Sequence, residues 1–119
     1  MEAIEFIEDS AQLNLNGLHF HIGSQILNMD NFKNLASSIN LILSELYNEG
    51  IEIEHINVGG GLGINYDNPI DEPIPDFQSY FELFNQHLNN SLFKHLHFEL
   101  GRSIVGPVSY THLTLPTKA

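Results

Sequence analysis

The chain has 119 residues and a formal net charge of -11, with only four lysines and arginines together. So little positive charge leaves no basic surface for the phosphates of nucleic acid or for anionic membrane lipids, and we expect neither as a partner. There is no cysteine for disulfides or thiolate metal sites, and the N-terminus lacks the basic start and long apolar core of a signal peptide, so we expect a cytoplasmic protein.

The first half of the chain predicts a helix, a strand and a second helix. Residues 2 to about 13 place apolar side chains at helical spacing with acids opposite, which indicates an amphipathic helix. Residues 17–22 alternate strictly between polar and apolar side chains, which is typical of a strand with two different faces. The second helix should begin at an N-cap on Asp30 and end at Gly50, since apolar residues recur at helical spacing between them.

The second half continues this order. A strand from about 53 to 58 runs into the glycine-rich residues 59–63, and a loop rich in proline, aspartate and asparagine follows at 65–75. Asp76 is placed to cap a third helix, and residues 95–100 form the third strand. Strands that alternate with helices favour right-handed crossovers and a parallel sheet, so the predicted fold class is α/β.

The last twelve residues, 108–119, break this pattern and resemble the translation of a transposon-end sequencing adapter. We therefore expect the native reading frame to have been cut near Pro107, and we exclude the tail from the fold. The alternative is a natural C-terminal strand or loop.

One face of each predicted strand is polar, and these faces hold His19, His21, His55, Asn57, His95, His97 and Glu99. The apolar faces of a parallel α/β sheet should meet the crossover helices, so the polar faces share the other side, as in a barrel lumen. Barrel enzymes carry their chemistry at the C-terminal ends of the strands, which favours His21, Gly59 and Glu99 over the deeper histidines. Alternatively, the histidines hydrogen-bond one another inside a core.

A candidate anion site lies at two of the strand ends. The run Gly59-Gly60-Gly61 allows close approach of the backbone to a ligand and exposes its N–H groups, which suits phosphate. Arg102 is the only arginine and follows the next strand, and Ser24 adds a hydroxyl from the preceding one. Taken alone, the glycines are equally typical of a tight turn.

Three motifs resemble those of a known family. The segments Gly-Leu-His-Phe-His-Ile-Gly-Ser-Gln (17–25), Val-Gly-Gly-Gly-Leu-Gly-Ile (58–64) and Glu-Leu-Gly-Arg-Ser-Ile-Val-Gly-Pro (99–107) are similar, in order and spacing, to diaminopimelate decarboxylases of the alanine-racemase-like pyridoxal-5'-phosphate (PLP) fold. The resemblance covers residues 1–107. A complete (β/α)₈ barrel takes about 250 residues, so the implied structure is the C-terminal part of a PLP-binding barrel, about its sixth to eighth strands.

The resemblance implies decarboxylation of an amino acid, meso-diaminopimelate, in the final step of lysine biosynthesis, by a homodimeric parent enzyme. Related ornithine and arginine decarboxylases carry each motif singly and stay open as alternatives. For the cofactor, the resemblance implies that His21 stacks on the pyridine ring. It also implies that Ser24 and the amides of Gly59, Gly60 and Gly61 hold the phosphate.

The motif at the third strand end carries the remaining implied contacts. Glu99 pairs with the ring nitrogen, and Arg102 contacts the phosphate and the substrate, with Leu100 and Gly101 between them at the cofactor. The family usually has proline where this chain has Leu100. A carboxylate beside the pyridine nitrogen favours its protonated form and strengthens the ring as an electron sink. The alternative is that Glu99 is a buried acid paired with a histidine.

The family holds PLP as a Schiff base to a lysine, and this chain offers no candidate for it. Lys33 falls in the first turn of a helix, Lys94 precedes its strand at the wrong end of the barrel, and Lys118 is in the suspected tail. We therefore expect that lysine and the second domain to lie beyond this chain, with no catalytic residue and no activity in the chain alone.

Two other classes of function stay open. The pairs His19-x-His21 and His95-x-His97 have the spacing of metal ligands on one strand face, which would suit a metal-dependent barrel hydrolase. That hypothesis leaves the triple glycine and Gly101-Arg102 unexplained. The other alternative is a non-catalytic PLP-binding protein on the same barrel.

Overall fold

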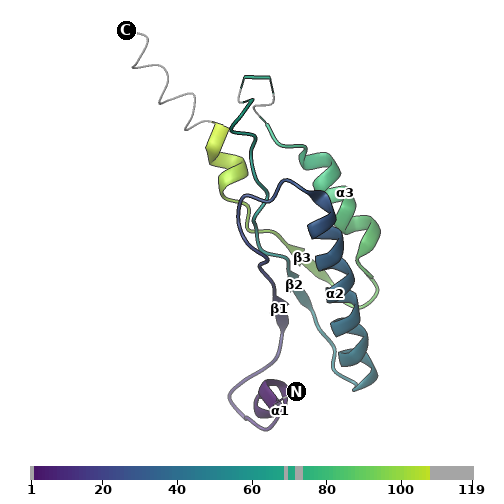
Figure 1. The fold of residues 1–119 in the computed structure, drawn as a ribbon. Coiled ribbons are helices and arrows are strands. Elements are labelled where there is room, and N and C mark those ends of the chain that lie inside the picture. Colours follow the sequence, from purple (N-terminus) through teal and green to yellow (C-terminus); the bar gives the residue numbers. More distant parts are fainter. Residues whose placement is uncertain (1, 69, 72–73, 108–119) are drawn as a thin grey trace.

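The computed structural model describes residues 2–68, 70–71 and 74–107 of the chain. Its elements are α1 (Glu2–Glu8), β1 (Gly17–His19), α2 (Met29–Asn48), β2 (His55–Asn57), α3 (Phe77–His87) and β3 (His95–His97). The three strands form one parallel sheet in the order β1-β2-β3, and α2 and α3 lie side by side against it (Figure 1). The predicted α/β order and the parallel sheet are therefore confirmed.

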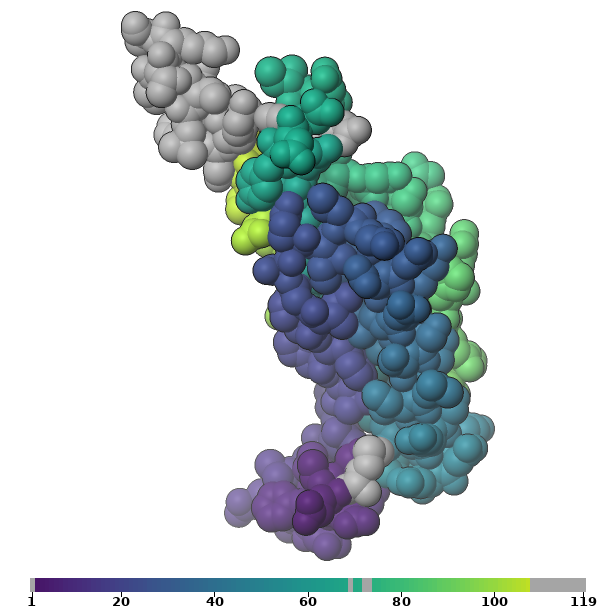
Figure 2. Space-filling view, viewed as in Figure 1, coloured from purple at the N-terminus to yellow at the C-terminus, as the bar shows by residue number. Residues whose placement is uncertain are grey.

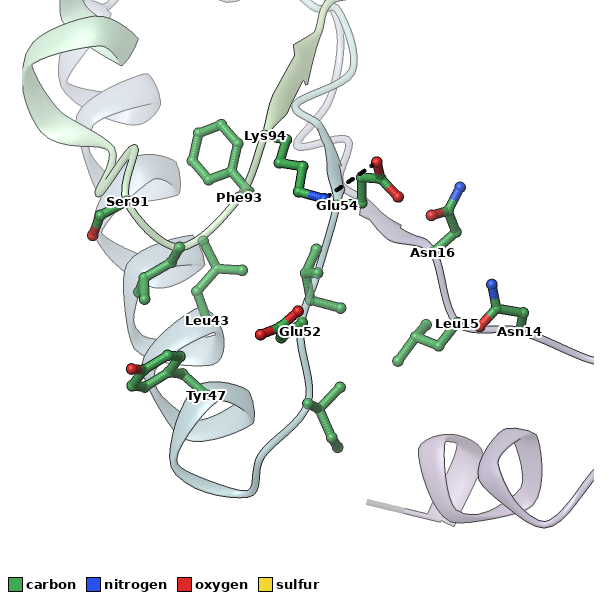
Figure 3. Close-up of a pocket in the computed structure, with 13 residues that line it drawn as sticks. Asn14, Leu15, Asn16, Leu43, Tyr47, Glu52, Glu54, Ser91, Phe93 and Lys94 are labelled. Carbon is green, nitrogen blue, oxygen red and sulfur yellow. Dashed lines mark ion pairs between the residues drawn. The ribbon is translucent and has the colours of Figure 1, made fainter.

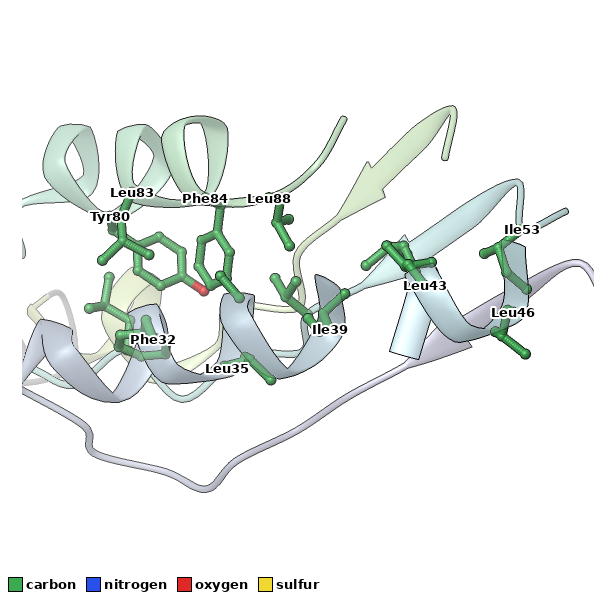
Figure 4. Close-up of a cluster of buried hydrophobic side chains, with 14 of the residues drawn as sticks. Phe32, Leu35, Ile39, Leu43, Leu46, Ile53, Tyr80, Leu83, Phe84 and Leu88 are labelled. Carbon is green, nitrogen blue, oxygen red and sulfur yellow. The ribbon is translucent and has the colours of Figure 1, made fainter. Parts of the chain in front are cut away.

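A continuous apolar core lies between the two long helices and the sheet. Its centre is an aromatic cluster in which Phe32 of α2 meets Tyr80 and Phe84 of α3 edge to face, with ring centroids 5.0 and 6.1 Å from Phe32 (Figure 4). Ile56 and Val58 close the core from the middle strand. Each fully buried side chain of this size contributes roughly 1.5–3 kcal/mol, so this layer holds the strands in place.

The helix ends show which side chains cap them. Asn28, not Asp30, is the N-cap of α2: its side-chain oxygen accepts a hydrogen bond of 2.9 Å from the backbone N–H of Asp30. The prediction at Asp30 was wrong because asparagine caps a helix as well as aspartate does, so the helix can begin after Asn28, two residues earlier. Gly50 follows the end of α2 with a φ of 80°, and Asp76 caps α3, both as predicted.

The first helix is shorter than predicted and ends at Glu8 rather than near Leu13. The chain turns at Ser10, whose hydroxyl accepts a hydrogen bond from the backbone N–H of Gln12. Short polar side chains of this kind compete with helical hydrogen bonds, which explains the early end. Figure 2 shows the resulting elongated body, with α1 in purple at one end.

Each strand is three residues long, shorter than the six predicted for it. Backbone pairing nevertheless continues beyond the strands, from Phe20 N to Asn57 O at 2.8 Å and from Glu99 N to Gly59 O at 2.8 Å. The chain then leaves the sheet, because Gly59 and Gly61 take φ values of 73° and 97°. Ile22, predicted on the apolar face, is consequently 41% exposed.

The described residues contain no helix that is both long enough and apolar enough to cross a membrane. The tail predicted at 108–119 lies outside the described residues, so the boundary near Pro107 stays a prediction.

Candidate functional site

The predicted site residues come from the C-terminal ends of the three strands. The glycine run explains how these ends approach so closely. A β-carbon on Gly59 would overlap the carbonyl oxygen of Phe20, and one on Gly60 would overlap the carbonyl oxygen of Glu99. Glycine is thus required first by the neighbouring backbones, on both sides of the middle strand, and not only by approach to a ligand.

The backbone N–H groups of this run are not all available to an anion. The amide of Gly59 donates to Asn57 Oδ1 at 2.8 Å, and that of Gly60 makes a long contact of 3.5 Å with His21 Nδ1. The described residues offer no acceptor to the amide of Gly61. The amides of Gly60 and Gly61 are therefore the ones that can hold an anion, whereas that of Gly59 already has a partner.

Glu99 pairs with a histidine, which the sequence offered only as an alternative to contact with the ring nitrogen. His19 Nε2 lies 2.9 Å from Glu99 Oε2, although β1 and β3 are separated by β2. Both side chains are more than half exposed on the open face of this three-stranded sheet. The sequence placed His19 deeper in the lumen and assigned it no role at the strand ends.

The other lumen histidines contact one another. His55 Nδ1 lies 2.9 Å from His97 Nε2, and the ring of His55 stacks on that of His95 with centroids 4.8 Å apart. These contacts agree with the alternative of mutual pairing, although the rings lie on an open face rather than in a core. No three histidine, aspartate or glutamate side chains of the described residues could hold a metal ion together, so the hydrolase alternative gains no support.

Gln25 joins the strand ends, and the sequence analysis did not single it out. Its Nε2 donates to Ile64 O at 2.6 Å, and its Oε1 accepts from Ile64 N at 3.2 Å. The same Oε1 lies 3.4 Å from Arg102 Nη1. Gln25 adopts a φ of 56°, a conformation uncommon outside glycine. Its sequence signal was its place as the last residue of the 17–25 motif, to which no separate role was assigned.

Arg102 and Ser24 are both exposed at this end. Arg102 begins a short helical stretch over residues 102–107, which the sequence did not predict. Within the described part of the chain, no carboxylate lies within salt-bridge distance of Arg102. The guanidinium is therefore available to an external anion.

A hollow of about 370 Å³ lies at the opposite end of the strands (Figure 3). It lies between the C-terminal part of α2 and the segments before the strands, and Lys94 at its edge pairs with Glu54 at 3.6 Å. Lys33 pairs with Asp30 in the first turn of α2. Neither lysine is at the strand ends where the candidate site lies, and Lys118 is outside the described residues.

Comparisons with known proteins show the family of this chain. A sequence profile described as pyridoxal-dependent decarboxylase, pyridoxal binding domain, matches residues 1–106. A diaminopimelate decarboxylase of Bacteroides thetaiotaomicron is 51% identical over 90 residues, which are 76% of this chain and 23% of that protein. A biosynthetic arginine decarboxylase of a Geobacter species is 39% identical over 66 residues, 55% of this chain and 10% of that one.

Solved structures give the same result. The crystal structure of diaminopimelate decarboxylase from M. jannaschii superposes with a TM-score of 0.78 at 34% identity and covers 87% of this chain and 24% of that one. The Helicobacter pylori diaminopimelate decarboxylase complexed with L-lysine gives a TM-score of 0.72 at 31% identity, with 87% and 26% covered. The chain therefore spans about a quarter of the length of these relatives.

Proposed function

Because the chain belongs to the pyridoxal-dependent decarboxylases, through their pyridoxal-binding domain, we propose that its full-length protein is a diaminopimelate decarboxylase. The 51% identity to the Bacteroides thetaiotaomicron enzyme is the observation that carries this substrate assignment. The Helicobacter pylori relative was crystallised with L-lysine, which is what diaminopimelate becomes when one carboxylate leaves as CO₂. Arginine and ornithine decarboxylation are the alternatives within the same family.

The chemistry of the donor set supports PLP as the cofactor. Ser24, Arg102 and the amides of Gly60 and Gly61 together offer a hydroxyl, a guanidinium and two backbone donors, which suits a phosphate. Glu99 offers the ring nitrogen a carboxylate. When bound, the cofactor supplies an electron sink for the electron pair left behind as CO₂ departs.

Each side chain then has a defined role in the proposed reaction. Glu99 holds a proton at the pyridine nitrogen, since an adjacent carboxylate favours the charged ring. His21 covers one face of the ring, and Arg102 binds the phosphate and orients the carboxylate of the substrate. The lysine that completes the site, and the homodimer that we propose as the active form, involve chain beyond these 119 residues.

The proposal is tested with the full-length protein and PLP. We expect CO₂ release with a higher kcat/KM for meso-diaminopimelate than for ornithine or arginine, and L-lysine as the product. The LL-isomer of diaminopimelate is the control for the configuration of the reacting centre, because the L-lysine product retains the L centre of the meso-isomer and the two isomers differ at the other centre. Faster turnover of ornithine or arginine would move the assignment to that branch, and absence of decarboxylation with PLP bound would favour the non-catalytic alternative.

A further inference from the structure

His19 and Glu99 meet across a strand that lies between them. Neighbouring strands are about 4.8 Å apart, so the backbones of β1 and β3 are separated by roughly 10 Å. The 2.9 Å contact between His19 Nε2 and Glu99 Oε2 therefore requires both side chains to reach over β2. Such a contact requires that no side chain of the middle strand lies between His19 and Glu99.

Two residues of the middle strand and its extension, Asn57 and Gly59, leave this space unoccupied. In the sheet register His19 lies level with Asn57, and Glu99 pairs with Gly59, two residues nearer the strand ends. Gly59 has no side chain, and the side chain of Asn57 turns back to accept the hydrogen bond of the Gly59 amide at 2.8 Å. Both residues thus keep the space above β2 free of side-chain atoms that would separate His19 from Glu99.

We propose that His19 is a positioning residue that orients Glu99 toward the nitrogen of the cofactor ring. The ring N–H of His19 at Nε2 donates to Oε2 and leaves Oε1 of the same carboxylate for the pyridine nitrogen. This inference rests on the proposed function, because it takes the ring nitrogen as the partner of Glu99. The contact with the ring nitrogen would then depend on His19 from the first strand as well as on Glu99.

The lack of other partners for Glu99 explains why a positioning residue matters. Among the described residues, its carboxylate has no partner other than His19. A glutamate side chain has several rotamers, and fixing one of them costs conformational entropy when the cofactor binds. A hydrogen bond from His19, whose backbone is held by the pairing of β1 with β2, favours one rotamer before binding.

The test compares binding of PLP with binding of its 1-deaza analogue, in which C–H replaces the ring nitrogen, to the full-length apoprotein. The measured quantity is the ratio of the two dissociation constants, because every contact except that to the nitrogen is shared. His19→Gln and His19→Asn form a matched pair: the glutamine amide reaches the position of Nε2, and the asparagine amide stops short of it. His95→Ala, on the same lumen face without contact to Glu99, is the control.

We expect the wild type to prefer PLP, and Glu99→Ala to lose that preference. His19→Asn should lower it by about fivefold, the scale of a partly exposed ion pair. His19→Gln and His95→Ala should keep the wild-type ratio. An unchanged ratio in His19→Asn, with the preference lost in Glu99→Ala, would overturn the role of His19 alone. A wild type that does not bind PLP, or binds both ligands equally, would overturn the assignment of Glu99 and this inference with it.

Discussion

Gly60 lies so close to Glu99 that a β-carbon added to it would overlap the carbonyl oxygen of Glu99. Both partners in that overlap are backbone, so neither can move without disturbing the ladder. We expect Gly60→Ala to destabilise the full-length apoprotein by about 1–3 kcal/mol, the usual cost of overpacking. Gly101→Ala is the matched control, since its added methyl would have nothing within 4 Å. Equal denaturation midpoints for the two variants would show that the strand ends are not packed as described.

Tyr80 should make the free energy of unfolding depend on pH in the alkaline range. Burial raises the pKa of its hydroxyl from 10.0 to about 12. Below pH 10 the group is protonated in both the folded and unfolded states, but between about pH 10 and 12 only the unfolded state loses the proton. The free energy of unfolding should therefore fall over that range, by up to about 2 kcal/mol.

The control for that measurement is Tyr80→Phe. The hydroxyl of Tyr80 is buried and has no hydrogen-bond partner among the described residues, so the variant should be at least as stable at pH 8 and lack this alkaline loss. Denaturant titrations of both proteins at pH 8, 10 and 11.5 provide the comparison. The same alkaline decline in the phenylalanine variant would assign it to other groups.

Gln25 should stabilise the strand ends through its hydrogen bonds to Ile64. Gln25→Ala removes both and leaves the N–H and C=O of the buried Ile64 without that partner, which we expect to cost about 1–3 kcal/mol. Alanine has the same difficulty as glutamine with a φ of 56°, so the change isolates the side chain. Gln86→Ala, exposed on α3, is the control. Indistinguishable unfolding free energies would contradict the role given to Gln25.

Substitutions of Glu99 and Arg102 should affect different quantities, turnover in the first case and PLP binding in the second. Glu99→Gln keeps the size of the side chain but loses its charge, so decarboxylation at saturating PLP should slow strongly while PLP still binds. Arg102→Ala should mainly weaken PLP binding, by about 1.5–3 kcal/mol if its charge-assisted hydrogen bonds have typical strength. Lys33→Ala, on the surface of α2, should change neither quantity. Full turnover in Glu99→Gln would exclude the electron-sink role.

The 119 residues alone should not fold cooperatively. Their parallel sheet has three short strands, two open edges and a polar face with exposed histidines. Thermal unfolding of the purified chain, followed by circular dichroism, should give a broad transition. A sharp, reversible transition would show that the layer of α2, α3 and the sheet is sufficient by itself.

The sequence predicted those features that depend on spacing along the chain. The parallel order, the Asp76 cap and the placement of Gly50 just after the end of α2 all follow from local patterns. The contact between His19 and Glu99 depends on the register of three strands and on the small residues between them, which no local pattern encodes. The two hydrogen bonds between the Gln25 side chain and the Ile64 backbone depend on a left-handed backbone conformation at Gln25 that glutamine seldom adopts.

The pairing of Ile26 with Leu62 divides this end of the chain into two zones. Up to Ile64, main-chain hydrogen bonds and the side-chain amide of Gln25 connect the glycine-rich segment to the segment that follows β1. The sheet therefore fixes the position of both segments. The chain beyond Ile64 starts from a fixed anchor. Insertions or exchanges in the loop directly after Ile64 add length outside the anchor and leave the glycine run in place. Homologous proteins can thus differ in that loop while the backbone contacts of the glycine run stay the same, which gives protein engineering a place to change this end of the chain without moving the strand ends.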